Sequence, residues 1–104
     1  MEGGIVMRVH RVRAEVVVAA CDRELVGQDL AVGAAGRTVR ISADFYGERV
    51  VSREELVWAM HRATIMNLLG RRVVDVARQE GFVADDGLGT LGGHPHAEVF
   101  GMPE

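Results

Sequence analysis

The sequence predicts an α+β domain in which a small, mostly antiparallel sheet packs on a long kinked helix. Two observations carry this prediction. Alternating or continuous apolar stretches fill the first half of the chain, and a helix-capping signal with helical periodicity follows them. At 104 residues the chain is expected to form a single domain over 1–104, because two halves would be too small to bury separate cores.

The first two strands are expected to form a hairpin. In the first segment, which starts at Ile5, Arg8 and His10 alternate with Met7 and Val9, as in a half-buried strand. Residues 15–21 form a nearly unbroken apolar run rich in Val, which is typical of a central strand or one covered on both faces. The pattern breaks at 11–14, which predicts a turn, and a capped single turn is expected over 22–27.

A third strand has the clearest alternation. It is predicted over 37–43, with Val39 and Ile41 pointing inward. A turn at 44–47 should follow it. The glycine-rich C-terminal part is expected to end in a short strand over 97–100.

The helix is predicted from its capping signal. Ser52 and Glu55 have the spacing of a capping box, in which each side chain bonds the other residue's amide. The helix is expected over 53–69, with a kink at Gly70 and a second helical piece over 71–80.

The helical periodicity gives this element two apolar sides. Winding at 3.6 residues per turn places Asn67 on a stripe that is otherwise apolar, with Thr64 beside it. Trp58 falls on nearly the opposite side. A helix that is apolar nearly all round is either central or shares a face with a partner, so a homodimer through the Trp58 face is one alternative.

Composition and charge exclude several classes of function. The net charge is −3 and the pI is near 5.8, which disfavours non-specific binding to a phosphate backbone. All 12 basic residues are Arg. The absence of Lys excludes Schiff-base catalysis by lysine and a P-loop lysine.

The same composition predicts a cytoplasmic protein. The single cysteine, Cys21, excludes an internal disulfide and suits a reducing compartment. No apolar run reaches the ~20 residues of a membrane span. The first residues lack the basic start and apolar stretch of a signal peptide.

Candidate ligand-binding residues lie on three segments. A buried amide such as that of Asn67 needs partners, and it either satisfies backbone groups near Gly70 or faces a ligand together with Thr64. Gly92 and Gly93 could shape an anion-binding nest beside His96. The third candidate is Cys21, which is either an inert core thiol or part of the same site.

No complete metal or catalytic set accompanies these residues. His94 and His96 share a face on an extended segment, but no further ligands with metal-site spacing lie nearby, so neither a metal nor a cofactor is expected. The basic cluster of Arg8, Arg11 and Arg13 is either a solvated hairpin edge or a contact surface for RNA.

Four segments of the chain resemble a known family. Residues 17–22, 45–47, 63–70 and 92–97 resemble small archaeal proteins grouped as domain-of-unknown-function family 424, and they occur in the expected order over most of the chain. The resemblance implies an archaeal cytoplasmic protein with a compact α+β fold and a loose association with RNA processing and translation. It implies no established activity. Family members often carry an apolar residue at the position of His94, which makes His96 the better candidate of the two histidines.

Three hypotheses about function follow. The first is a non-enzymatic binding module that acts with RNA or a translation-related protein. The second is a small-molecule or enzymatic site where Asn67, Cys21 and the His96 loop converge, which requires Asn67 and His96 to be adjacent. The third is a structural homodimer built on the Trp58 face.

Overall fold

The computed structural model describes residues 3–100. It contains eight strands, three α-helices and two short 3₁₀ helices within that range. The strands are β1 (Ile5–Val12), β2 (Glu15–Asp22), β3 (Asp29–Val32), β4 (Arg37–Arg40), β5 (Val50–Val51), β6 (Ile65–Leu69), β7 (Gly89–Leu91) and β8 (His94–Val99). The helices are η1 (Arg23–Leu25), α1 (Ala43–Tyr46), α2 (Arg53–Met60), α3 (Arg71–Gln79) and η2 (Asp85–Gly87).

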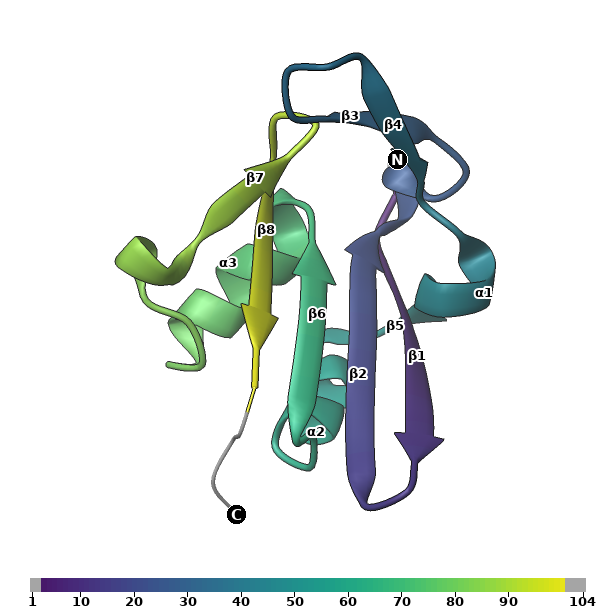
Figure 1. Ribbon diagram of the computed structural model, residues 1–104. Helices are drawn as coiled ribbons and strands as arrows, with labels where there is room; N and C mark the ends of the chain where they lie inside the picture. Colours follow the sequence, from purple (N-terminus) through teal and green to yellow (C-terminus); the bar gives the residue numbers. More distant parts are fainter. Residues whose placement is uncertain (1–2, 101–104) are drawn as a thin grey trace.

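Six of the strands form one sheet in the order β5-β1-β2-β6-β8-β7, and β3 and β4 form a separate ribbon (Figure 1). Only the central pair, β2 and β6, is parallel, and the other pairs of the six-stranded sheet are antiparallel. The α+β class and the mostly antiparallel sheet are therefore confirmed. The parallel pair needs a crossover connection, which the chain from β3 to α2 supplies.

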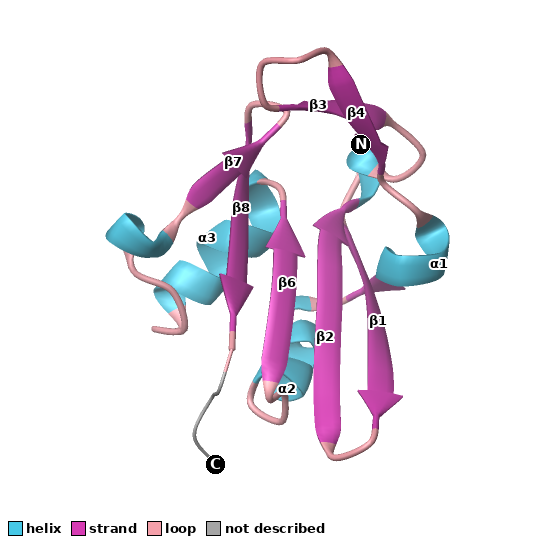
Figure 2. Ribbon diagram, viewed as in Figure 1, coloured by secondary structure: helices cyan, strands magenta, loops and turns pink. Residues whose placement is uncertain are grey.

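The two longer helices cover one face of the sheet. Figure 2 shows α2 and α3 behind the strands, and the apolar side chains of that face form the larger of two cores. Leu56 and Met60 of α2 and Val73 of α3 are fully buried there. Met66 and Leu68 of β6 meet them from the sheet, as the two-residue period of a strand requires.

The opposite face carries a smaller core over its upper part only. The ribbon of β3 and β4 lies above the sheet, and α1 lies beside β1 (Figure 1). Leu30 of β3, Ile41 and Tyr46 pack there against Cys21 and Leu69. The lower part of this face has no helix or strand over it within residues 3–100 (Figure 2).

The predicted long kinked helix is wrong. The capping box is present, with Ser52 Oγ accepting from the Glu55 amide and Glu55 Oε1 accepting from the Ser52 amide, each at 3.0 Å. However, α2 ends at Met60, and residues 65–69 form the central strand β6 rather than a helical continuation. The periodicity of a short apolar run does not distinguish a helix from a strand. In the folded chain this run lies between β2 and β8 and is hydrogen-bonded to both as a strand.

The position where the sequence predicted a kink, Gly70, instead separates strand β6 from helix α3. Gly70 has φ 113°, and a Cβ atom there would overlap the carboxyl carbon of Asp22. The carboxylate of Asp22 instead accepts from the amides of Arg72 and Val73, each at 3.0 Å, at the start of α3. The end of β2 is thereby joined to the helix that follows β6.

The end of α3 agrees with the sequence. The amide of Phe82 bonds the carbonyl of Ala77 at 2.9 Å, and that of Gly81 bonds the carbonyl of Arg78 at 3.1 Å. This is the Schellman pattern. No helix in the described part of the chain is long and apolar enough to cross a membrane.

Candidate functional site

Asn67 lies at the centre of a polar network on the sheet face opposite α2 and α3. The hydroxyl of Tyr46 donates to Asn67 Oδ1 at 2.7 Å, and Nε2 of His96 lies 3.3 Å from the same oxygen. Asn67 Nδ2 donates to Glu98 Oε2 at 3.1 Å. These contacts hold the amide in one orientation, with its nitrogen toward Glu98.

Strand pairing brings the four side chains together. Asn67 is opposite Glu98 in the β6–β8 pair, and Leu69 is opposite His96. Because side chains on a strand alternate, His96 and Glu98 point to the same face as Asn67. Tyr46 reaches them from α1, whose first turn is capped by Ser42. Asn67 is thus adjacent to His96, as the second hypothesis required, although it lies on a strand and not on a helix.

We call the uncovered lower part of this sheet face the open face. Its members are Arg8 and His10 of β1, Val17 of β2, Ile65 and Asn67 of β6, and Glu98 of β8. The pairs Val17–Ile65 and His10–Val17 are neighbours in the register, so two half-buried apolar side chains lie beside the polar side chains of His10 and Asn67.

One margin of the open face is formed by an aromatic ring. The ring of His10 stacks on that of Phe45, with centroids 5.2 Å apart and planes 17° from parallel. His10 Nε2 donates to the carbonyl oxygen of Phe45 at 2.7 Å. Phe45 in turn packs edge-on against Tyr46, with ring centroids 4.8 Å apart. Helix α1 therefore contacts His10 through Phe45 and Asn67 through Tyr46.

Cys21 lies beneath this network, in the core. Its side chain has no exposed surface, and Sγ donates to the carbonyl of Asp22 at 3.2 Å. Burial, together with the charges of Asp22 and Glu24, raises the pKa of the thiol to about 12. The thiol is therefore protonated at neutral pH, and its place is that of an apolar core group.

Burial also raises the pKa of Tyr46, with smaller contributions from Cys21 and Glu98. The phenol therefore stays protonated over the ordinary pH range and remains a hydrogen-bond donor to Asn67. The network needs this donor because Asn67 Oδ1 can only accept.

The remaining ligand-binding candidates lie away from Asn67. Thr64 stands at the start of β6, where its hydroxyl accepts from the Val16 amide at 2.8 Å and donates to Glu15 at 2.7 Å. Gly92 and Gly93 form the two-residue turn between β7 and β8, with φ of 58° and 83°. Thr64 joins β6 to β2, the two glycines join β7 to β8, and none of the three is hydrogen-bonded to Asn67.

The three arginines of the predicted basic cluster separate. Arg8 points to the open face, whereas Arg11 lines a groove on the helix-covered side with Trp58. Arg13 lies in the β1–β2 turn with φ 58°, which is the left-handed region. Only Arg8 and Arg13 are thus placed to contact something on the open face or at its lower margin.

Tyr46 and Glu98 were not among the sequence candidates. Glu98 could have been found, since it continues the alternation of His94 and His96 on an extended segment. Tyr46 had no such signal, because residue 46 reaches residue 67 only through the folding of α1 over β2.

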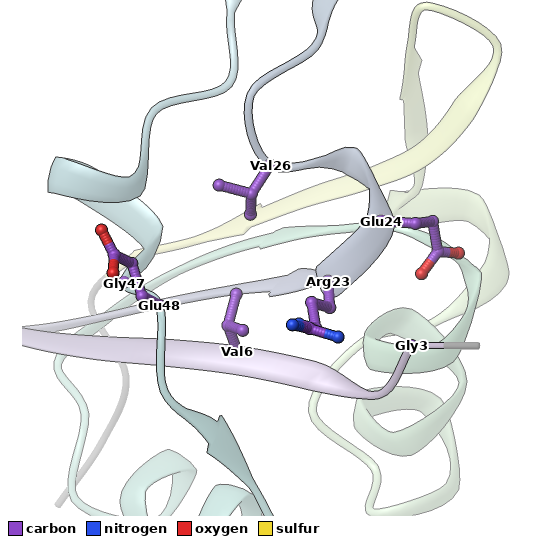
Figure 3. A pocket seen from close by; sticks show the side chains of 7 residues that line it. All are labelled: Gly3, Val6, Arg23, Glu24, Val26, Gly47 and Glu48. Atoms are coloured by element: carbon purple, nitrogen blue, oxygen red, sulfur yellow. The ribbon is translucent and has the colours of Figure 1, made fainter. Parts of the chain in front are cut away.

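Two of the recesses outside the open face lie near the end of β2. One, of about 470 Å³, lies between η1, β1 and the residues after α1. In Figure 3, Val6 and Val26 point toward each other across it, and the Arg23 guanidinium lies beside Val6. The other, of about 490 Å³, lies where β2 and β6 end, and Arg71, Arg72 and His94 are among its lining residues. Neither includes Asn67 or His96. Within residues 3–100, no group of three or more His, Cys, Asp or Glu side chains could hold a metal ion.

Fold and site together define a small α+β domain whose sheet has one helix-covered face and one open face. The chain belongs to the family described as "Protein of unknown function (DUF424)", whose model matches residues 10–102. The resemblance seen in the sequence is thereby confirmed.

A solved structure agrees with this assignment. The chain is similar to an uncharacterized conserved protein from Methanopyrus kandleri, with a TM-score of 0.81 and 28% identity over 96% of this chain and 93% of that one. No curated protein matches the chain.

Proposed function

We propose that this protein is a non-enzymatic binding module and that its open face binds single-stranded RNA. The observation that carries the proposal is the open face itself. It combines the apolar side chains of Val17 and Ile65 with a hydrogen-bonded pair, Asn67 and Glu98, whose amide is held in one orientation. It also carries an exposed arginine, and no helix or strand of the described chain covers it.

The chemistry of the open face suits unstacked bases. Single-stranded RNA is recognised by flat surfaces that support the face of a base and hydrogen-bond its edge. Val17 and Ile65 provide an apolar support, and the stacked pair of His10 and Phe45 borders it. The second hydrogen on Asn67 Nδ2 and the second carboxylate oxygen of Glu98 have no partner among residues 3–100, so a donor and an acceptor remain for a base edge.

The distribution of charge favours binding of RNA at the open face over non-specific binding to its phosphate backbone. Arg8 is exposed and makes no ion pair with another residue of the described range. Arg13 is likewise exposed at the tip of the hairpin. Because the whole chain carries −3, we expect these two arginines to contribute the phosphate contacts while base contacts provide most of the affinity.

Fluorescence anisotropy with labelled single-stranded RNA tests the proposal. We expect Arg8→Ala and Glu98→Gln to weaken binding, and Arg37→Ala to leave it unchanged. Arg37 is the matched control because it is an exposed strand arginine on β4, away from the open face. Circular dichroism should show that all three variants fold. A wild-type protein that binds no RNA, or an equal loss in Arg37→Ala, would contradict the proposal.

A second candidate is a small-molecule site at the same place. It is favoured by the contact between Asn67 and His96, which the hypothesis required. Binding of free mononucleotides distinguishes the RNA-binding function from the small-molecule site, because a mononucleotide has a base but no RNA strand. Binding of a mononucleotide as tightly as the RNA strand would favour the small-molecule site, whereas binding of the strand alone would favour the RNA module.

A further inference from the structure

The second half of β1 is a free edge of the sheet. β1 pairs with β2 along its whole length, whereas β5 covers its other side only at Ile5 and Val6. The residues after α1 approach the next two positions, because a Cβ atom on Gly47 would lie 2.8 Å from the carbonyl oxygen of Met7 and 3.2 Å from Cβ of Arg8. Residues 8–12 therefore have no second partner strand in the described part of the chain (Figure 1).

The hairpin register decides which backbone groups of this edge point outward. A two-residue turn joins Val12 to Glu15, and the residues of such a closing pair exchange both of their hydrogen bonds. The backbone groups of Arg8 and His10 therefore face β2, and those of Val9 and Arg11 face outward. No backbone hydrogen bond within residues 3–100 joins those outward groups to another segment.

The side chains at this edge are unusually apolar for a free edge. Val9 is 38% exposed, Val12 is 55% exposed, and Trp58 on the adjacent helix α2 is 61% exposed. A groove of about 360 Å³ lies between Val9 and Trp58, on the helix-covered side of the sheet. Its lining includes Val9, Arg11, Val16, Trp58 and Arg62. Unpaired backbone and exposed apolar side chains together favour the addition of another strand.

We propose that this edge pairs with the same edge of a second copy of the chain, antiparallel and around a two-fold axis at His10. The sheet then continues through the dimer. In this register Val9 is opposite Arg11 of the second copy, and these two residues exchange the outward backbone hydrogen bonds. Arg11 of the second copy lies beside Val9 at the mouth of the groove that contains Trp58.

The second copy fits because the edge is self-complementary. With the axis at His10, no arginine is opposite another arginine: Arg8 is opposite Val12 and Val9 is opposite Arg11. An axis at Arg11 would oppose two arginines, which is unfavourable. An axis at Val9 would need the backbone of Met7, which the residues near Gly47 approach. At the other margin of the sheet, β7 has only three residues and offers a shorter partner.

Two substitutions at one exposed position test the register. Val9→Arg places like charges opposite each other, and Val9→Glu places a carboxylate opposite Arg11 of the second copy. Each contact occurs twice across the two-fold axis, so we expect Val9→Arg to raise the dimer dissociation constant about tenfold and Val9→Glu to lower it by a similar factor. Analytical ultracentrifugation over a concentration series measures both, and circular dichroism checks folding.

The outcomes decide the proposal. A concentration-dependent dimer that responds with opposite signs to the two substitutions supports it. A wild-type protein that stays monomeric at all concentrations overturns it, as do open-ended oligomers. Equal weakening by both substitutions would also overturn it, because a contact through another register does not distinguish the two charges.

Discussion

At the scale of single residues, burial decides what Cys21 can do. Its thiol has no exposed surface and a pKa raised to about 12 by burial and by the charges of Asp22 and Glu24. We expect iodoacetamide at neutral pH to leave the folded protein unmodified and to alkylate one thiol per chain after denaturation. Mass spectrometry distinguishes these results. Rapid alkylation of the folded protein would mean that Cys21 is accessible, contrary to the structure.

The same thiol should make stability depend on alkaline pH. Its pKa is raised from 9.0 in the unfolded chain, so its contribution to the free energy of unfolding is complete below pH 9 and is lost as pH rises toward 12. Cys21→Ala should therefore flatten the fall in stability over this range. Denaturant titrations of both proteins at several pH values measure it. Tyr46 contributes in the same direction in the wild type and in Cys21→Ala. Only the difference between the free energies of unfolding of the two proteins therefore reports on Cys21.

Arg13 combines backbone strain with a place at the margin of the open face. A residue with a side chain costs about 1–2 kcal/mol in the left-handed region, where Arg13 has φ 58°. We expect Arg13→Gly to stabilise the fold by about 1 kcal/mol and to weaken RNA binding. Arg13→Ala is the control, since it removes the charge and keeps the strain. If Arg13→Gly gains no stability in chemical denaturation over Arg13→Ala, the turn is not strained.

At the scale of elements, the junction of β2, β6 and α3 depends on one glycine. Gly70 has φ 113°, and a Cβ atom there would overlap the carboxyl group of Asp22, which caps α3. Gly70→Ala should lower the free energy of unfolding by about 2–4 kcal/mol. Gly87→Ala is the matched control, because a Cβ atom there meets nothing within 4 Å and needs no left-handed backbone. Thermal denaturation that shows similar losses in both variants would contradict this account.

The junction also explains where the sequence prediction of elements failed. Both ends of the expected helix were right: the capping box starts α2, and the Schellman pattern at Gly81 ends α3. The error lies between them, at residues 61–69. Local signals mark the ends of helices well. A five-residue apolar segment, however, is too short to distinguish the 3.6-residue period of a helix from the two-residue period of a strand. Its position between β2 and β8 requires a strand.

At the scale of the whole molecule, the net charge limits how the open face can bind RNA. Two arginines, Arg8 and Arg13, are placed for phosphate contacts, while the chain as a whole carries −3. Each contact with single-stranded nucleic acid contributes a slope of about −0.7 to log K against log salt, so we expect a slope of about −1.4. Anisotropy titrations at several salt concentrations measure it. A much steeper slope would show that binding is mainly electrostatic and lies outside the open face.

The dimer would also change the open face as a whole. Pairing through β1 continues the sheet, so the open faces of two copies would join along the strands that carry Arg8 and His10. Ultracentrifugation with and without RNA would show whether the two events are linked, because a ligand that contacts both copies shifts the equilibrium toward the dimer.

The sequence by itself determined the α+β class, the first hairpin, the helix ends and the absence of a lysine-based site, because these depend on residue types and on short-range periodicity. It also singled out Asn67 and His96. Only the tertiary structure decided that Asn67 belongs to a strand, that Tyr46 and Glu98 complete its hydrogen bonds, and that Cys21 is buried beneath them. These partners are 21 to 31 residues from Asn67 along the chain. Contacts at such separations arise from sheet register and from the packing of α1, and no local pattern encodes them.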